Sequence, residues 1–178
     1  SLGTNGLVKI AGSSGGSSEK IINNVQLSAQ KISPQCIVNA STATGQISNI
    51  NIFYTGFRGM TGSTSTVGLY LGNIVTSWIE KSYFDTDLST QILDGGSFTN
   101  SLAFRGNFFD AMPGASTHNF MVTLNTCEGC NFSDNVFESG PFGLRLLGSG
   151  TASLGVNINN NWFGDPLVAG STGTWIDV

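Results

Sequence analysis

Three carboxylates recur at one position of a repeated segment in this 178-residue chain, and aromatic residues recur two positions before it. The carboxylates are Asp85, Asp110 and Glu138. The aromatic residues are Tyr83, Phe108 and Trp162. Paired carboxylates serve as acid and base or nucleophile when a glycosidic bond is cleaved, and aromatic rings stack on the flat apolar faces of sugars. These residue types together predict a polysaccharide ligand, of neutral or acidic sugars.

The segment that carries these residues is one of a series with the same spacing of apolar positions. The series starts at Ile22, Ile47, Ile79, Phe104, Phe132 and Ile158, at intervals of 25 to 32 residues. A repeat of that length, made of strand and turn signals, is typical of a parallel β-solenoid. We therefore predict an all-β, single-stranded solenoid of about six rungs.

Strand alternation assigns each position of the repeat to a face. The fourth and sixth positions point inward, and the fifth and seventh point outward. The inward fourth column is Val25, Ile50, Ser82, Asn107, Asn135 and Asn161, and the inward sixth column is Leu27, Ile52, Phe84, Phe109, Phe137 and Phe163. The outward fifth column is Gln26, Asn51, Tyr83, Phe108, Val136 and Trp162, and the outward seventh column is Ser28, Phe53, Asp85, Asp110, Glu138 and Gly164. We expect the phenylalanine rings to stack and the asparagine amides to form a structural ladder.

The acidic column predicts a catalytic pair. Neighbouring strands lie ~4.8 Å apart and alternate strands ~9.6 Å apart, which brackets the carboxylate separations of retaining and inverting glycosidases. The expected pair is Asp110 with Asp85 or Glu138, and repulsion between close carboxylates would raise one pKa. Two alternatives remain: the acids act as gatekeepers against edge pairing, or a subunit or loop covers the aromatic residues. Glu80 and Arg105 occupy equivalent positions on adjacent rungs and are expected to form a surface ion pair within reach of the ligand.

A second strand run precedes several rungs, at residues 67–71, 120–124 and 142–146. No stretch shows a helical period with capping signals. An antiparallel β-sandwich remains the alternative fold, although it would not repeat the same residue types in successive units. We expect one domain over residues 1–178, with clear rungs over residues 20–165, as part of a longer chain.

Composition excludes several classes of function. The formal charge is −4, the isoelectric point is near 4.6, and the Lys and Arg residues are scattered, so no basic surface for nucleic acid is expected. No apolar run has the length that a bilayer requires, so we expect no membrane insertion. Cys36, Cys127 and Cys130 are expected to be free thiols, mostly buried. A Cys127–Cys130 zinc site would lack ligands, and His118 is expected in a loop, so no metal or cofactor is predicted.

The rung signature resembles a known family. Gly106-Asn-Phe-Phe-Asp110, Asp134-Asn-Val-Phe-Glu138 and Asn160-Asn-Trp-Phe-Gly164 are similar to the right-handed parallel β-helix of pectate-lyase-like proteins, especially bacteriophage tailspikes. The resemblance covers residues 20–165. It implies a homotrimer, in a virion or extracellular, that binds and often cleaves capsule or O-antigen chains. Asp85, Asp110 and Glu138 would be its catalytic residues by type. The chain lacks a polygalacturonase-like acidic motif and a pectate-lyase-like calcium cluster.

Three functions follow from these patterns. The first is a tailspike that depolymerises a bacterial surface polysaccharide, as a glycoside hydrolase or a polysaccharide lyase. The second is a receptor-binding or adhesin β-helix that needs the aromatic column and not the acids. The third is a monomeric secreted polysaccharide lyase or hydrolase. The expected substrate-binding residues are Tyr83, Phe108, Trp162, Glu80 and Arg105.

Overall fold

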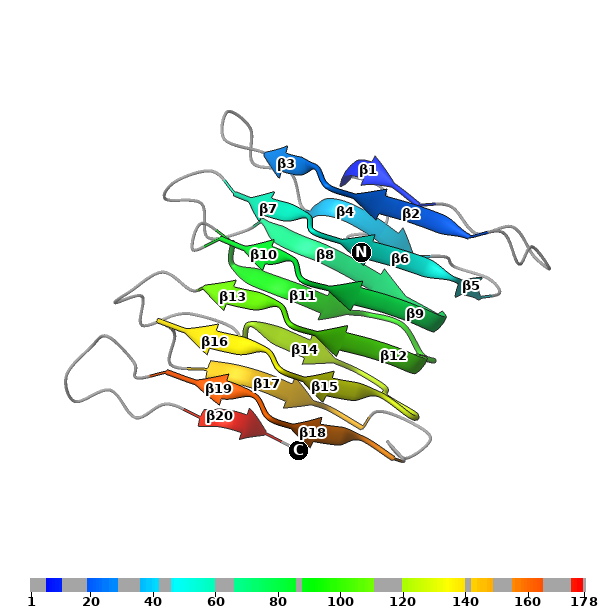
Figure 1. Ribbon diagram of the computed structural model, residues 1–178. Helices are drawn as coiled ribbons and strands as arrows, with labels where there is room; N and C mark the ends of the chain where they lie inside the picture. Colours follow the sequence, from blue (N-terminus) through cyan, green and yellow to red (C-terminus); the bar gives the residue numbers. More distant parts are fainter. Residues whose placement is uncertain are drawn as a thin grey trace.

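The computed structural model describes residues 6–10, 19–28, 36–41, 46–59, 66–85, 88–110, 120–139, 142–148, 155–164 and 174–177. These residues form β-strands joined by turns and contain no helix. The strands build three parallel sheets, and the chain passes through the sheets in turn as it descends from the N-terminal to the C-terminal strands (Figure 1). The molecule is therefore a parallel β-solenoid, as the repeat predicted, and the antiparallel alternative is wrong.

The three sheets are named here by letter. Sheet A contains β1 (Gly6–Lys9), β4 (Cys36–Ser41), β8 (Val67–Gly72), β11 (Thr90–Asp94), β14 (Val122–Leu124), β17 (Phe142–Leu146) and β20 (Thr174–Asp177). Sheet B contains β2 (Lys20–Asn23), β6 (Ile50–Phe53), β9 (Ile74–Glu80), β12 (Asn100–Arg105), β15 (Asn131–Ser133) and β18 (Asn157–Asn159), with β5 (Ile47–Ser48) also paired to β9. Sheet C contains β3 (Gln26–Ser28), β7 (Gly56–Arg58), β10 (Tyr83–Phe84), β13 (Phe108–Asp110), β16 (Val136–Glu138) and β19 (Trp162–Phe163).

A single residue in the left-handed conformation makes each turn from sheet B to sheet C. These residues are Asn24, Tyr54, Lys81, Gly106, Asp134 and Asn160, with φ between 47° and 64°. Left-handed backbone is costly for residues other than glycine. A repeated hydrogen bond offsets the cost, because the turn residue donates its backbone N–H to a carbonyl of the next coil, as from Lys81 to Arg105 at 2.9 Å. The outer faces of sheets B and C are therefore separated by a short, uniform turn.

The interior phenylalanine column forms a continuous stack. Adjacent ring centroids from Phe57 through Phe84, Phe109 and Phe137 to Phe163 lie 4.5 to 5.0 Å apart, with interplanar angles of 3° to 20°. Phe104 and Phe132 stack in the same way at the end of sheet B. Residues from all three sheets join these rings in one buried core. The predicted ring column is confirmed for Phe84, Phe109, Phe137 and Phe163.

The asparagine ladder is also confirmed. Asn107 donates through Nδ2 to Oδ1 of Asn135 at 3.0 Å, and Asn135 donates to Oδ1 of Asn161 at 2.8 Å. Each amide also donates to a backbone carbonyl, for example from Asn135 to Phe104 at 3.0 Å. Because both functions of the buried amides are satisfied, the ladder stabilises the turn instead of carrying a penalty.

The register of one coil differs from the sequence prediction. Ile22 pairs with Ile52 and not with Ile47, since Ile47 lies in β5 and Asn49, with φ 56°, turns the chain before β6 begins. The positions assigned to Ile50, Asn51, Ile52 and Phe53 therefore belong to other residues. Their true occupants are Thr55, Gly56, Phe57 and Arg58.

Val25 is the other correction to the inward columns. The side chain is 42% exposed instead of buried. Val25 belongs to the first described coil, and in the described part of the chain only the coil of Thr55 and Gly56 packs beneath it. A residue with a neighbour on one side alone cannot be enclosed as the corresponding residues of inner coils are.

Candidate functional site

The outer face of sheet C brings the predicted aromatic residues into one column. Tyr83 pairs in register with Phe108, Phe108 with Val136, and Val136 with Trp162. The ring centroids of Tyr83 and Phe108 are 5.5 Å apart. Tyr83 is 42% exposed and Trp162 is 53% exposed, whereas Phe108 is half-buried. The column therefore presents exposed aromatic surface at both of its ends.

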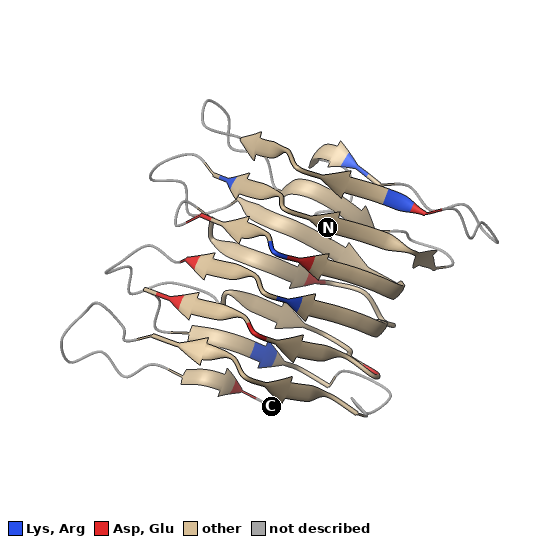
Figure 2. Ribbon diagram, viewed as in Figure 1, with Lys and Arg blue, Asp and Glu red and all other residues tan. Residues whose placement is uncertain are grey.

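The acidic column lies beside it, at the ends of β10, β13 and β16 (Figure 2). Asp110 and Glu138 are register partners. Asp85 continues the ladder by donating its backbone N–H to the Phe57 carbonyl at 3.0 Å. Carboxylates on adjacent strands of this column start ~4.8 Å apart at the backbone, as the sequence predicted.

Arg58 adds a cation that the predicted register had placed elsewhere. Its Nε lies 3.0 Å from Oδ2 of Asp85. Once the register is corrected, Arg58 is the seventh-position residue of the coil next to Asp85. The acidic column therefore begins with an ion pair, and its three carboxylates have different surroundings.

Tyr83 joins the aromatic column to the acidic column. Its hydroxyl donates a hydrogen bond to Oδ2 of Asp110, with an oxygen to oxygen distance of 3.2 Å. Burial, the charges of Asp110 and Asp85 and this hydrogen bond raise the pKa of Tyr83 to about 12, against the opposing effect of Arg58. The phenol therefore stays protonated at neutral pH and acts as a donor.

The environment of Asp110 favours the neutral form of its carboxyl group. Burial raises its pKa, hydrogen bonds from the hydroxyls of Ser139 and Tyr83 oppose this, and the charges of Glu138 and Asp85 raise the pKa further. Its Oδ1 is shielded from solvent and has no hydrogen-bond partner among the described residues. A proton on this oxygen would relieve the cost of burying a charge.

Gln91 supports Asp110 from the opposite sheet. Its side chain, at the start of β11, is buried and donates through Nε2 to the backbone carbonyl of Asp110 at 2.7 Å. Sequence reasoning missed this contact, because it depends on how sheet A folds back toward the end of β13. The contact fixes the backbone that carries the carboxyl group.

Trp162 lies over its own strand end. A methyl group added at Gly164 would come within 2.3 Å of the indole ring. The absence of a side chain at Gly164 therefore lets the indole cover the backbone where other coils carry an acid. In this coil the Trp162 ring therefore covers the place where Asp85, Asp110 or Glu138 stands in other coils, so the aromatic surface is larger and the acidic column ends.

Glu80 and Arg105 form the predicted ion pair, at 3.8 Å, but on the outer face of sheet B. The turn at Lys81 and Gly106 separates them from the acidic column. They are not part of the sheet C site, and any contact with the ligand has to occur on the neighbouring face.

The cysteines differ from the prediction. Cys127 and Cys130 are joined by a disulfide, and Cys36 is a buried free thiol. The expectation of three free thiols is wrong because the turn brings the Cα atoms of Cys127 and Cys130 to 5.7 Å, within bonding range. Within the described ranges no group of three or more His, Cys, Asp or Glu side chains is arranged to hold a metal ion. His118 lies outside the described residues.

Comparisons with known proteins give no name to the arrangement. No protein-family model, no curated protein and no solved structure matches the chain. In the described part of the chain no helical segment has the length and hydropathy that a membrane crossing requires.

Proposed function

We propose that this chain is part of a phage-type tailspike that binds and depolymerises a bacterial surface polysaccharide, a capsule or O-antigen. The observation that carries the proposal is the contact between Tyr83 and Asp110, because it joins an exposed aromatic column to a carboxyl group with a raised pKa. Glycoside cleavage uses a carboxylic acid and a second carboxylate, and aromatic surface beside them binds the sugar.

The roles of the carboxylates follow from their surroundings. Asp110 is the general acid and protonates the glycosidic oxygen as the bond to the anomeric carbon breaks. The carboxylate of Asp85, which forms an ion pair with Arg58, attacks the anomeric carbon and forms a glycosyl ester. Asp110 then takes a proton from water, whose oxygen displaces Asp85 and regenerates both groups. Glu138 acts through its charge, which raises the pKa of Asp110.

A retaining hydrolase is favoured over a lyase. A lyase requires a base to remove a proton beside a carboxylate of the sugar. Tyr83, with a pKa raised to about 12, is unsuited to that task near neutral pH. Carboxylates on neighbouring strands, Asp110 with either Asp85 or Glu138, match the ~5 Å separation of retaining enzymes. Asp85 is assigned as the nucleophile because it forms the ion pair with Arg58.

The assembly belongs to the same proposal. We infer a right-handed solenoid of about six rungs, supported by the strong preference of parallel crossovers for this hand, and a homotrimer in a virion or outside the cell. The Cys127–Cys130 disulfide supports an oxidising environment. Light scattering coupled to size exclusion tests the trimer: a mass near three times 18.6 kDa is expected, and a monomer would favour a secreted enzyme.

The activity is tested with a panel of purified capsular polysaccharides and O-antigens. We expect wild-type protein to shorten one of them, and Asp110→Asn and Asp85→Asn to lose turnover while binding is retained. Glu138→Gln should keep turnover with an altered pH profile. Binding without cleavage by the wild-type chain would instead establish a receptor-binding protein, which needs only the exposed rings of Tyr83 and Trp162.

A further inference from the structure

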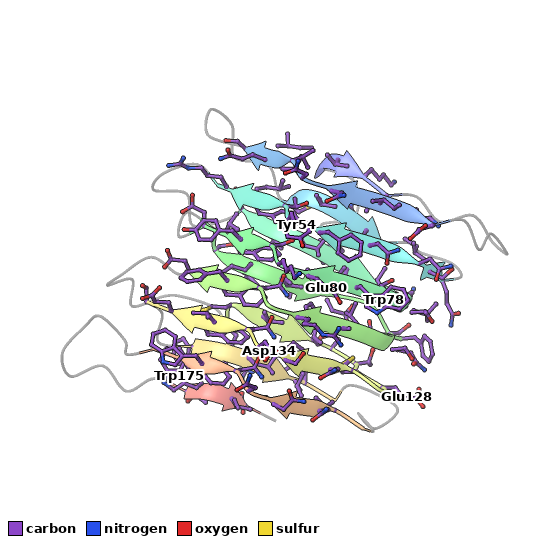
Figure 3. The ribbon with its side chains drawn as sticks, viewed as in Figure 1. Tyr54, Trp78, Glu80, Glu128, Asp134 and Trp175 are labelled. Atoms are coloured by element: carbon purple, nitrogen blue, oxygen red, sulfur yellow. A yellow bond between two sulfur atoms is a disulfide. The ribbon has the colours of Figure 1, made fainter. Side chains whose placement is uncertain are left out.

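The outer face of sheet B carries a second group of aromatic residues, across the turn from the acidic column. Phe53 and Tyr54 belong to one coil and Trp78 to the next. Tyr54 is 56% exposed and Trp78 is 37% exposed. Figure 3 shows Tyr54, Trp78 and Glu80 on the same side of the ribbon. The sheet B patch is defined as Phe53, Tyr54, Trp78, Glu80, Lys81 and Arg105.

Charged groups divide the aromatic surface of this patch. Glu80 is the register partner of both Phe53 and Arg105, and the Glu80–Arg105 ion pair spans 3.8 Å. Lys81 Nζ lies 5.3 Å from the centre of the Tyr54 ring and donates to its hydroxyl at 3.1 Å. Cores of protein interfaces are depleted of charged residues. Separate rings surrounded by hydrogen-bonding groups instead suit a sugar, which offers an apolar face and a rim of hydroxyls.

The oxygen of a buried amide beside Trp78 is unsatisfied within the described part of the chain. Asn51 is the register partner of Trp78 and is only 6% exposed. Its Nδ2 donates to Glu19, but its Oδ1 has no hydrogen-bond partner among the described residues. A buried acceptor left unsatisfied is unfavourable. A ligand hydroxyl that donates to this oxygen would satisfy it.

We propose that the sheet B patch is a second, non-catalytic glycan-binding site. A pyranose ring of a neutral sugar stacks on Trp78 and directs hydroxyls toward Asn51, Glu80 and Arg105. The inference rests on the proposed function only in that the ligand is the same polysaccharide. No second carboxylate is a register neighbour of Glu80 in this patch, so the patch holds the polymer without cleaving it.

The sheet B patch lies next to the sheet C site. The single-residue turns at Tyr54 and Lys81 place it next to the Tyr83 side of sheet C. One polysaccharide chain can therefore occupy both faces, and the second contact becomes intramolecular once the first has formed. Long chains should bind more tightly than short ones for this reason.

The test measures binding in an Asp110→Asn background, where the polymer is not cleaved. Titration calorimetry with the polysaccharide identified by the panel should show about tenfold weaker binding when Trp78→Ala is added, from loss of one stacked ring. Trp78→Phe should give a smaller loss with an unchanged melting temperature. The control is Leu147→Ala, a comparably exposed apolar side chain at 48%, which should leave binding unchanged.

The outcomes separate this inference from the proposed function. Wild-type affinity in the Trp78→Ala variant would overturn the sheet B site alone. If Trp78→Ala weakens binding but the wild-type protein never cleaves the polysaccharide, the sheet B site is supported and the proposed depolymerase activity is overturned. A wild-type chain that binds no polysaccharide of the panel would overturn both.

Discussion

The hydroxyl of Tyr83 donates a hydrogen bond to the Asp110 carboxylate of the neighbouring strand, at 3.2 Å. This bond stabilises the ionised form of Asp110 and so opposes the rise in pKa that burial causes. Burial and the Tyr83 hydrogen bond therefore act in opposite directions on the pKa of Asp110. A change of Tyr83 to phenylalanine removes the hydroxyl and keeps the ring.

Tyr83→Phe should raise the pKa of Asp110. The general acid works in its protonated form, so turnover falls as pH rises through this pKa, and the alkaline limb of the pH profile should move to higher pH in the variant. A carbon NMR titration of the carboxyl group gives the same information without activity. Tyr54→Phe is the matched control, because its hydroxyl contacts Lys81 instead. An unchanged or lowered pKa in Tyr83→Phe would contradict the assignment.

Asn135→Ala should be among the most destabilising single changes. It removes the acceptor of the Asn107 backbone N–H and a donor to the Phe104 carbonyl, and a buried polar group left unsatisfied costs about 1–3 kcal/mol. We expect the free energy of unfolding to fall by about 3–5 kcal/mol in urea titration. Asn159→Ala removes an exposed amide and should change it by less than about 0.5 kcal/mol. Equal effects of the two changes would show that the ladder is not structural.

Asp94 should make stability fall as pH rises. This carboxyl group at the end of β11 is fully buried, and burial raises its pKa, although hydrogen bonds from Gly96, Thr99 and Thr126 oppose the rise. The folded state therefore holds the proton more tightly than the unfolded state. The stabilisation is complete below the ordinary Asp pKa of about 4 and is lost as pH rises through the raised pKa of the folded state.

The comparison with Asp94→Asn isolates this contribution. Urea titrations of both proteins across a pH series should show the stability of the wild type, relative to the variant, declining from acid to neutral pH. Asp110 is present in both proteins, so its own titration cancels. A difference that is constant or grows with pH would mean that the pKa of Asp94 is not raised.

Gly164→Ala should displace the Trp162 indole. The added methyl group would come within 2.3 Å of the ring, and an exposed side chain can swing aside, so we expect a small change in melting temperature and weaker polysaccharide binding. Gly56→Ala is the control on the same sheet, since its added methyl group would meet Gln26 at an ordinary 3.6 Å. Retained affinity in Gly164→Ala would remove Trp162 from the binding surface.

The sequence predicted those features that repeat by residue type. Asn107, Asn135 and Asn161, like the phenylalanines beside them, have the same chemistry in successive coils, so their alignment is unambiguous. The apolar residues of the coil that contains Ile47 and Ile52 are compatible with two alignments to the repeat. Only the observed strand pairing selects between these alignments. That choice decides whether Arg58 or Phe53 stands beside Asp85.

Other parts of the site depend on distances in space. Gln91 reaches Asp110 from another sheet, and the Cys127–Cys130 disulfide depends on the path of a turn. Neither leaves a periodic signal in the sequence. The placement of Tyr54 and Trp78 on neighbouring coils of one face was missed because the left-handed turn that joins sheets B and C has no consistent residue type, as Asn, Tyr, Lys, Gly and Asp all occupy it.

Each ring contact in the stack from Phe57 to Phe163 joins two neighbouring coils, and none of these contacts joins residues of the same coil. Each inner ring has two neighbours, whereas a coil at either end of the stack loses one of its contacts. Stability in such an array is a sum of terms between nearest neighbours, so amide hydrogen exchange should be slowest around Phe84 and Phe109 and should quicken toward both ends. Opening would then proceed as fraying from the ends of the ring stack, and the residues of the sheet C site, Tyr83 and Asp110, lie beside its middle, in the part that opens last.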